Sequence, residues 1–155
     1  MVSIATDRIV ERGEMQAFVR KRNHGVLLTL RCDGRPQASL VTMGLDEQGD
    51  AVLVSSYPER AKSLNLRRNE QAWVVVMSDA WAGEWVQLEC RGEVVDMPDA
   101  MEGLVEYFRV ISGEHSDWDD YRAAMTRQDK VLLRLNIESW GPISKGGFPA
   151  RLVEE

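Results

Sequence analysis

The segment Val52 to Met77 reads VLVSSYPERAKSLNLRRNEQAWVVVM, and it joins two β-branched runs through a short cationic stretch. The runs Val52–Ser55 and Trp73–Met77 predict buried strands, because Val-rich segments of this length suit a covered, pleated surface. Between them, Pro58 predicts the start of a helix, since proline is tolerated in the first helical turn. The segment therefore predicts a strand, a helix and a second strand in succession.

The predicted helix carries a net positive charge, although the chain as a whole is negative. Residues 59–68 contain the cations Arg60, Lys62, Arg67 and Arg68 against the single acid Glu59, whereas the whole sequence has a net charge of −6. Arg60 and Lys62 lie where the positive end of the helix dipole disfavours cations. A bound anion would reverse that penalty, and Ser55 and Ser56 at the preceding strand end can add hydroxyl donors. We interpret this strand end and helix start as a phosphate site, with a merely solvated turn as the alternative.

The composition is that of an ordinary globular protein. The chain has 155 residues, 44% hydrophobic and 28% charged, which fits one domain over residues 1–155 with a sizeable core. No stretch approaches the roughly 20 apolar residues that a membrane helix needs, so we expect a cytoplasmic protein without a membrane segment. Cys32 and Cys90 lack CxxC spacing, which predicts two buried free thiols and no metal site.

Acidic residues are concentrated between residues 96 and 129, a region that carries as much negative charge as the whole chain, −6. The remainder is close to neutral, with its cations around residues 20–22 and 60–68. Such a balance predicts no nucleic-acid-binding face, because a duplex requires many phosphate contacts. It is compatible with a small anionic ligand.

Hydrophobic periodicity predicts a mainly β fold with helices added to it. The expected helices cover residues 7–21, 58–68 and 98–112, with a fourth after residue 116. The expected strands cover residues 25–32, 36–45, 51–56, 71–78, 84–96 and 130–137, with hairpin turns at 33–36 and 46–50 and a bulge at Gly92. We expect the first three strands to pair in succession. Six strands with hairpin connections indicate a small antiparallel barrel, followed by a C-terminal arm over residues 141–155.

Three stretches resemble one family of cofactor-binding proteins. They read GVLLTLRCDGRPQASLV at residues 25–41, SSYPERAKSLNLRRNEQAWVVV at 55–76 and GEHSDWDDYRAAM at 113–125. The chain is similar to the flavin- and deazaflavin-binding split β-barrels related to pyridoxamine 5′-phosphate oxidase, and within them to the actinobacterial coenzyme F420-dependent reductases. The resemblance covers about residues 8–140. It implies a six-stranded antiparallel split β-barrel that forms a homodimer with its cofactor at the subunit interface.

The resemblance also implies a set of cofactor-binding residues. They are Gln37, Ser39, Ser55, Ser56, Arg60, Ala61, Lys62, Asn65 and Trp85. The residues from Arg60 to Asn65 correspond to the phosphate and tail end of the cofactor, with the two adjacent serines nearby, and those of the second strand lie near the ring system. Trp85 corresponds to an aromatic that reaches the cofactor from the partner chain, or else packs within its own subunit. Leu40 departs from the pattern, because relatives have a polar Asn there.

The implied activity is that of a coenzyme F420-dependent reductase, which transfers a hydride from reduced deazaflavin to a small conjugated acceptor. The protein would position donor and acceptor and stabilise developing negative charge. His24 and His115 lie in no arrangement typical of a nucleophile with its base, so no catalytic side chain is identified. The alternatives are an FMN-dependent oxidoreductase like pyridoxamine-phosphate oxidase, and a non-catalytic protein that binds F420 or haem.

Overall fold

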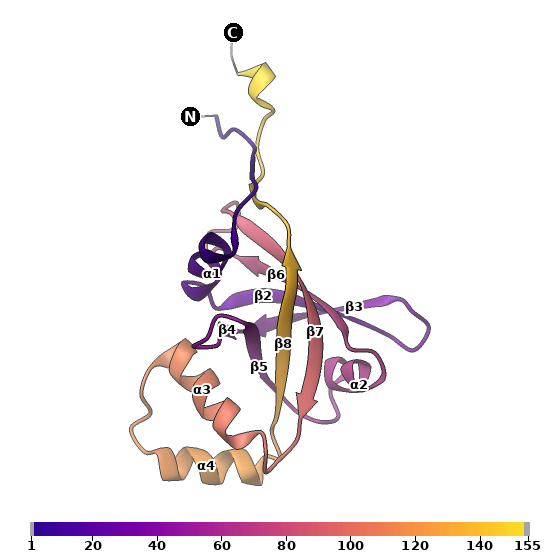
Figure 1. Ribbon diagram of the computed structural model, residues 1–155, viewed down its shortest axis with the longest axis vertical. Coiled ribbons are helices and arrows are strands. Elements are labelled where there is room, and N and C mark those ends of the chain that lie inside the picture. The colour runs from indigo at the N-terminus through magenta and orange to yellow at the C-terminus, as the bar shows by residue number, and fades with distance from the viewer. Residues whose placement is uncertain (1, 154–155) are drawn as a thin grey trace.

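Figure 1 shows the computed structural model, which describes residues 2–153 as a curled antiparallel sheet with helices packed around it. The strands are β1 (Thr6–Arg8), β2 (His24–Leu30), β3 (Pro36–Thr42), β4 (Gly44–Leu45), β5 (Ala51–Ser56), β6 (Gln71–Met77), β7 (Trp85–Val95), β8 (Val131–Trp140) and β9 (Ile143–Lys145). The helices are α1 (Arg12–Arg20), α2 (Ala61–Arg68), α3 (Met101–Ser112) and α4 (Trp118–Arg127), with a short 3-10 turn at Ala150–Leu152. The sheet runs β3-β2-β6-β7-β8-β5-β4, and β9 pairs with both β1 and β7.

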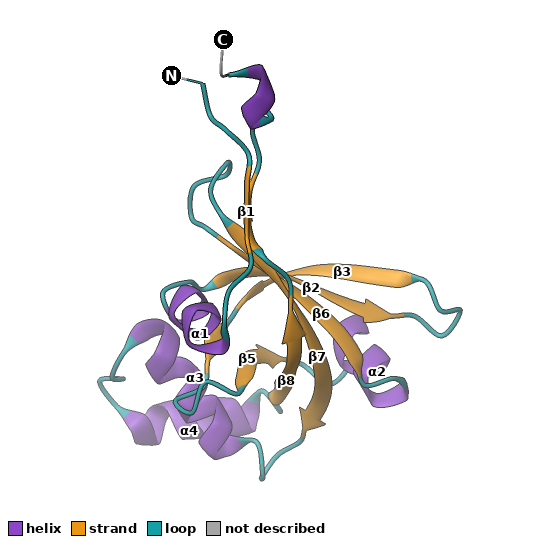
Figure 2. Ribbon diagram, turned by 45° about the horizontal axis from the view of Figure 1, so that its top comes forward, coloured by secondary structure: helices purple, strands orange, loops and turns teal. Residues whose placement is uncertain are grey.

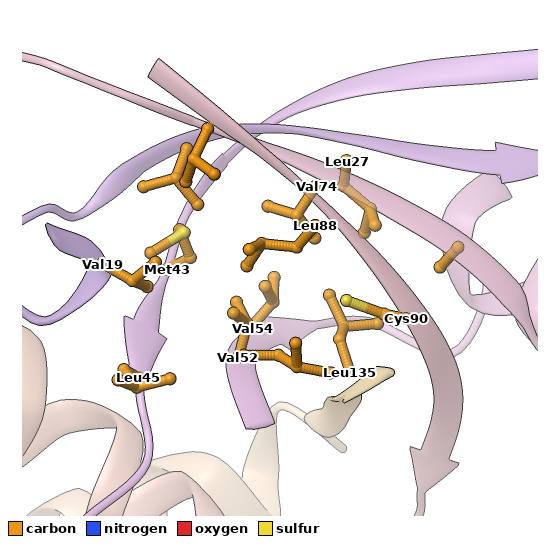
Figure 3. Close-up of a cluster of buried hydrophobic side chains, with 14 of the residues drawn as sticks. Val19, Leu27, Met43, Leu45, Val52, Val54, Val74, Leu88, Cys90 and Leu135 are labelled. Atoms are coloured by element: carbon orange, nitrogen blue, oxygen red, sulfur yellow. The ribbon is translucent and has the colours of Figure 1, made fainter. Parts of the chain in front are cut away.

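Alternation along the strands places the main core inside the curl of the sheet. Side chains of a strand point to opposite faces in turn, so every second residue of β2, β6 and β7 is buried. Figure 3 shows Leu27, Val74 and Leu88 facing Val54 and Leu135 across this interior. The mainly β fold with added helices that the sequence predicts is thereby confirmed.

A second, smaller core lies under α3 and α4, on the other face of β5 and β8. Leu53 and Leu132 pack there against Leu104 and Tyr121, and the Tyr121 hydroxyl donates to the Leu104 carbonyl at 2.8 Å. Burial raises the pKa of Tyr121 to about 12. Figure 2 shows the two helices grouped at one end of the sheet.

The expected strand over residues 36–45 is divided in two. Met43 turns inward and is fully buried, and the chain then continues as β4, which pairs with β5. Asn23 fixes this break, because its Nδ2 donates to the Met43 carbonyl at 2.9 Å. Residues 36–42 therefore pair with β2, and only Gly44 and Leu45 pair with β5, whose other neighbour is β8. The expected pairing of the first three strands in succession is confirmed at β2–β3 and β4–β5, but β3 itself does not pair with β5.

The two ends of the described chain also pair, which the sequence did not predict. β1 occupies part of the expected first helix, and β9 occupies part of the expected arm. Ile143 is buried, and Trp140 Nε1 donates to the Val10 carbonyl at 2.9 Å, so this pairing is anchored to the body of the protein. The sheet therefore has nine strands within residues 2–153, and the expected count of six is wrong. Residues 1, 154 and 155 of the expected domain and arm lie outside the described residues.

The irregularity in β7 lies between Glu89 and Cys90, and not at Gly92 as predicted. Gly92 has a different role, since a methyl group there would overlap the Leu66 side chain of α2. The missing side chain lets α2 pack closely on the sheet. In the part of the chain that the structure describes, no helix is long and apolar enough to cross a membrane.

Candidate functional site

The first turn of α2 presents unpaired backbone donors. β5 continues through Tyr57 into a turn, and the helix begins at Ala61, three residues later than the sequence suggests. Arg60 takes the N-cap position without a side-chain oxygen to accept a hydrogen bond. Within residues 2–153, the N–H groups of Ala61, Lys62 and Ser63 have no acceptor, and the Leu64 N–H is the first to bond, at 3.0 Å to the Arg60 carbonyl. Such a helix start attracts anions.

Arg60 and Lys130 lie beside the Tyr57 ring near this helix start, and their charges both act on Lys62. We call Arg60, Lys62 and Lys130 the cationic cluster. Lys130 Nζ lies 3.8 Å from the centre of the Tyr57 ring, and Arg60 Cζ lies 5.9 Å from it. Among the residues that the structure describes, none of the three makes an ion pair. Burial, followed by the charges of Arg60 and Lys130, lowers the pKa of Lys62. A bound anion would relieve this repulsion.

The other two cations of the segment face elsewhere. Arg67 forms a two-pronged pair with Asp96, with Nη1 at 2.9 Å from Oδ2. Arg68 donates to Asn65 Oδ1 at 2.5 Å. Lys130, and not Arg67 or Arg68, is the third cation of the cluster. It was not identified from the sequence. Only the strand pairing reveals it, because Val131 on β8 lies opposite Ser56 on β5 and so brings residue 130 beside Tyr57.

Asn65 links α2 to the inner face of the sheet. Its Nδ2 donates to Thr29 Oγ1 at 3.0 Å, and both side chains are buried. The Thr29 hydroxyl in turn lies 3.4 Å from Gln37 Oε1, and Gln37 Nε2 donates to Ser39 Oγ at 3.0 Å. The network thus brings together three predicted site residues from α2 and β3.

An open hollow of about 350 Å³ lies between β3 and α2. Its lining residues are Arg31, Cys32, Gln37, Ala61, Leu64, Asn65 and Arg68. Three predicted residues therefore line one hollow, and it adjoins the cationic cluster along α2. Gln37 Oε1, whose hydrogen bonds within the protein are long at 3.4 Å, can accept from a polar ring edge, while Leu64 and Ala61 offer apolar contact.

The two serines at the end of β5 point to opposite faces of the sheet. Ser56 is buried beneath α2, and its hydroxyl lies 3.2 Å from Ser63 Oγ. Ser55 is half-buried on the other face, as the alternation of a strand requires. The structure therefore does not bring them together, and it adds Ser63, whose hydroxyl donates to the Tyr57 carbonyl at 2.7 Å.

Trp85 lies on the outer face of the sheet, away from the hollow. It belongs to what we call the apolar face, formed by Val26, Leu28, Leu40, Trp73, Val75, Met77 and Trp85. Leu40 is 85% exposed and Trp85 is 38% exposed. Gln37 and Ser39 point to the inner face of β3 and Leu40 to the outer one, so within one chain Trp85 does not meet the hollow.

The two histidines lie outside this site. His24 Nδ1 is 3.0 Å from Asp79 Oδ1, and both side chains are well exposed. His115 packs among the rings of α3 and α4, and its Nδ1 accepts from the Asp117 N–H at 2.9 Å. In the region described, no cluster of three or more His, Cys, Asp or Glu side chains is arranged to hold a metal ion.

The cysteines differ from each other, and the expectation of two buried thiols is wrong for one of them. Cys90 is buried inside the curl, and desolvation raises its pKa to about 12, so its thiol is inert. Cys32 is exposed because it follows the last residue of β2 in the turn towards β3.

Comparison with known proteins identifies the fold. The family model for pyridoxamine 5′-phosphate oxidase matches residues 12–144. A conserved hypothetical protein from Mycobacterium tuberculosis is 19% identical, with a TM-score of 0.72, covering 91% of this chain and 89% of that one. An F420 reductase is 18% identical, with a TM-score of 0.61 and coverage of 81% and 94%. A haem storage protein from Vibrio cholerae is 18% identical, with a TM-score of 0.63 and coverage of 86% and 95%.

Proposed function

The chain belongs to the pyridoxamine 5′-phosphate oxidase family, and on that basis we propose that it is a coenzyme F420-dependent reductase of small conjugated molecules. The observation that carries the proposal is the cationic cluster, which gathers at the start of α2 in a chain of net charge −6. When bound, the coenzyme supplies a hydride, and the protein supplies binding, orientation and charge stabilisation.

The anionic end of the coenzyme fits the start of α2. Arg60 and Lys62 offer charge-assisted hydrogen bonds, and the free N–H groups of the first turn offer more. Without an anion, burial and then the charges of Arg60 and Lys130 lower the pKa of Lys62. A bound anion gives each cation a partner and offsets the unfavourable charge interactions, which favours binding.

The ring system fits the hollow between β3 and α2. Gln37 lines this hollow and is held in place by hydrogen bonds to the Ala38 carbonyl and to Ser39, so its polar groups are oriented before a ligand arrives. Groups that are fixed in advance cost less to order on binding and stabilise developing charge more effectively. These side chains would orient the ring, and water would be excluded by Leu64, which lines the same hollow.

A second copy of the chain would cover the apolar face. The face offers Leu40, 85% exposed, next to half-buried Val26 and Val75, and the neighbouring Trp81 is 90% exposed. Apolar areas of this kind mark interaction surfaces, and homodimers bury the same patch of both subunits. The resemblance implies that Trp85 reaches the cofactor from the partner chain, and its place on this face would bring it to the interface of such a dimer.

The FMN-dependent alternative rests on the family match, because a single phosphate also fits the start of α2. A haem-binding role is less well supported, since neither histidine lines the hollow and Cys32 is the candidate axial ligand among the lining residues. Titration separates these cases. We expect coenzyme F420 to bind with a Kd in the micromolar range, about −8 kcal/mol, and more tightly than FMN or haemin.

A second experiment separates a reductase from a storage protein. Reduced coenzyme F420 bound to the protein is mixed with a panel of enones, and its oxidation is followed by stopped-flow absorbance. We expect at least one enone to be reduced faster than in the absence of protein. If the protein accelerates none of them, the reductase proposal fails and a binding role takes its place.

A further inference from the structure

Lys130 is held at the cationic cluster by a turn of the chain far from α2 in sequence. The turn from α4 to β8 contains Asp129 in the left-handed region, with φ 47°, and the Lys130 N–H donates to the Met125 carbonyl at 3.2 Å. The neighbouring Gln128 accepts from the Tyr57 hydroxyl at 3.2 Å. The same turn therefore contacts Tyr57 twice, once at its hydroxyl and once at its ring.

The position of Lys130 over Tyr57 adds a third cation near the start of α2. The ring face attracts the ammonium group, which lies 3.8 Å from the ring centre. Arg60 competes for the same ring at 5.9 Å, and the charges of Arg60 and Lys130 both act on Lys62. Glu59 precedes Arg60 in the sequence and Asp129 precedes Lys130, yet neither acid forms an ion pair with the cluster within residues 2–153. Water and salt screen these charges in the free protein, and a ligand with anionic groups would pair with them directly.

We propose that Lys130, seated on Tyr57, extends the anion site of α2 and makes it selective for ligands with several anionic groups in a row over ligands with one phosphate. This inference rests on the proposed function and specifies which end of the coenzyme the site recognises. The start of α2 with Arg60 and Lys62 is sufficient for one phosphate. Lys130 reaches the site from the turn before β8 and lies closer to the Tyr57 ring than Arg60 does, so it offers a separate contact for a further carboxylate or phosphate.

The test compares Lys130→Gln with Lys21→Gln. Lys21 is an exposed lysine at the end of α1, so its substitution removes the same charge at a distance from the site. We expect Lys130→Gln to raise the Kd for coenzyme F420 about tenfold, to change the Kd for FMN less than about threefold and to weaken the salt dependence of F420 binding. Lys21→Gln should behave like the parent. Equal losses for both ligands, or none for F420, would overturn the inference.

A coenzyme-free probe keeps this inference separate from the proposed function. Tripolyphosphate carries several anionic groups in a row, and orthophosphate carries one, so thermal shifts with each can be compared at equal ionic strength. We expect tripolyphosphate to raise the melting temperature of the parent and of Lys21→Gln more than that of Lys130→Gln. If the parent binds neither F420 nor FMN but shows this difference, the proposed function fails and the role of Lys130 stands. Identical shifts in all three proteins would overturn it.

Tyr57 provides a second check on the arrangement. Tyr57→Phe keeps the ring under Lys130 and removes the hydroxyl that bonds to Gln128, whereas Tyr57→Leu removes the ring. We expect Tyr57→Phe to retain the preference for tripolyphosphate over orthophosphate and Tyr57→Leu to lose it. If Tyr57→Leu retains the full preference, the ring does not position Lys130 and the inference is wrong.

Discussion

Asn65 on α2 donates from Nδ2 to Thr29 Oγ1 on β2 at 3.0 Å, inside the curl of the sheet. Its Oδ1 accepts from Arg68 at 2.5 Å, so both ends of the amide are used within the protein. Asn65 therefore positions α2 on the sheet, and with it the helix start that carries Arg60 and Lys62. The resemblance implies that Asn65 takes part in cofactor binding. We infer that it does so mainly by holding α2 in place through its hydrogen bond to Thr29.

Replacement of Asn65 by Ala should lower the free energy of unfolding by about 1–3 kcal/mol, because the buried Thr29 hydroxyl loses its donor. Urea denaturation measures the change. The double variant Thr29→Val with Asn65→Ala should lose less than the sum of the two single variants, because the pair shares one interaction. Simple additivity would show that the bond does not stabilise the fold.

Asp46 is the buried charge on which the β4–β5 turn depends. Its carboxylate accepts from Arg134 Nη2 at 2.7 Å and from the N–H groups of Asp50 and Ala51 at 2.8 and 3.1 Å. We expect Asp46→Ala to cost about 2–4 kcal/mol of unfolding free energy, because the N–H groups of Asp50 and Ala51 lose their acceptor and the partly exposed Arg134 loses its ion-pair partner. The control is Asp50→Ala, which removes an exposed pair with Arg12 and should cost less than about 1 kcal/mol. Similar losses in both variants would contradict this assignment.

The strands illustrate what the sequence determines. β2, β5, β6, β7 and β8 lie where periodicity predicts them, because each buries every second side chain or lies in a Val-rich run. The break at Met43 was not predictable in the same way. Residues 36–45 read as one continuous strand, and the break depends on Asn23 and on the core that buries Met43, which exists only in the folded sheet.

The candidate site could also be predicted only in part from the sequence. Arg60 and Lys62 were recognisable because they reverse the local charge within one segment. Lys130 was not, because its place depends on the pairing of β8 with β5 across a long separation in sequence. The two serines were grouped because they are adjacent, although adjacent residues of a strand point to opposite faces.

Leu40→Glu should dissociate the proposed dimer. The substitution places a charge on the apolar face at a residue that is 85% exposed in the single chain, so the fold of the monomer should survive. Sedimentation velocity measures the result. Gln48→Glu introduces the same charge at the turn before β5, near the opposite end of the strand order, and should remain dimeric. A parent protein that is monomeric, or a dimeric Leu40→Glu, would contradict the proposal.

Binding of an anionic ligand should depend on pH through Lys62. Burial and then Arg60 and Lys130 lower the pKa of Lys62 from 10.5, so the free folded protein loses this proton earlier than the unfolded chain. Burial of the charged Lys62 next to two other cations therefore lowers the free energy of unfolding at low pH. This loss of stability disappears as the pH rises through the lowered pKa of Lys62. A bound anion restores the proton. We expect coenzyme F420 binding to weaken as pH rises through that pKa.

Proton uptake measures this linkage directly. Calorimetric titrations in two buffers of different ionisation enthalpy should show proton uptake on F420 binding between the lowered pKa and 10.5. Lys62→Arg is the matched variant, because arginine stays charged over this range and should abolish both the uptake and the weakening. Unchanged uptake in Lys62→Arg would assign the proton to another group.

The central claim is that Arg60 and Lys62 bind the anionic end of a redox coenzyme, and fluorescence titration with coenzyme F420 tests it most directly. The parent and the control Lys21→Ala should bind with a Kd in the micromolar range. Arg60→Ala and Lys62→Ala should each lose about 1.5–3 kcal/mol of binding free energy, roughly tenfold or more in Kd, with the fold intact. If both variants bind the coenzyme as tightly as the parent, the claim is wrong.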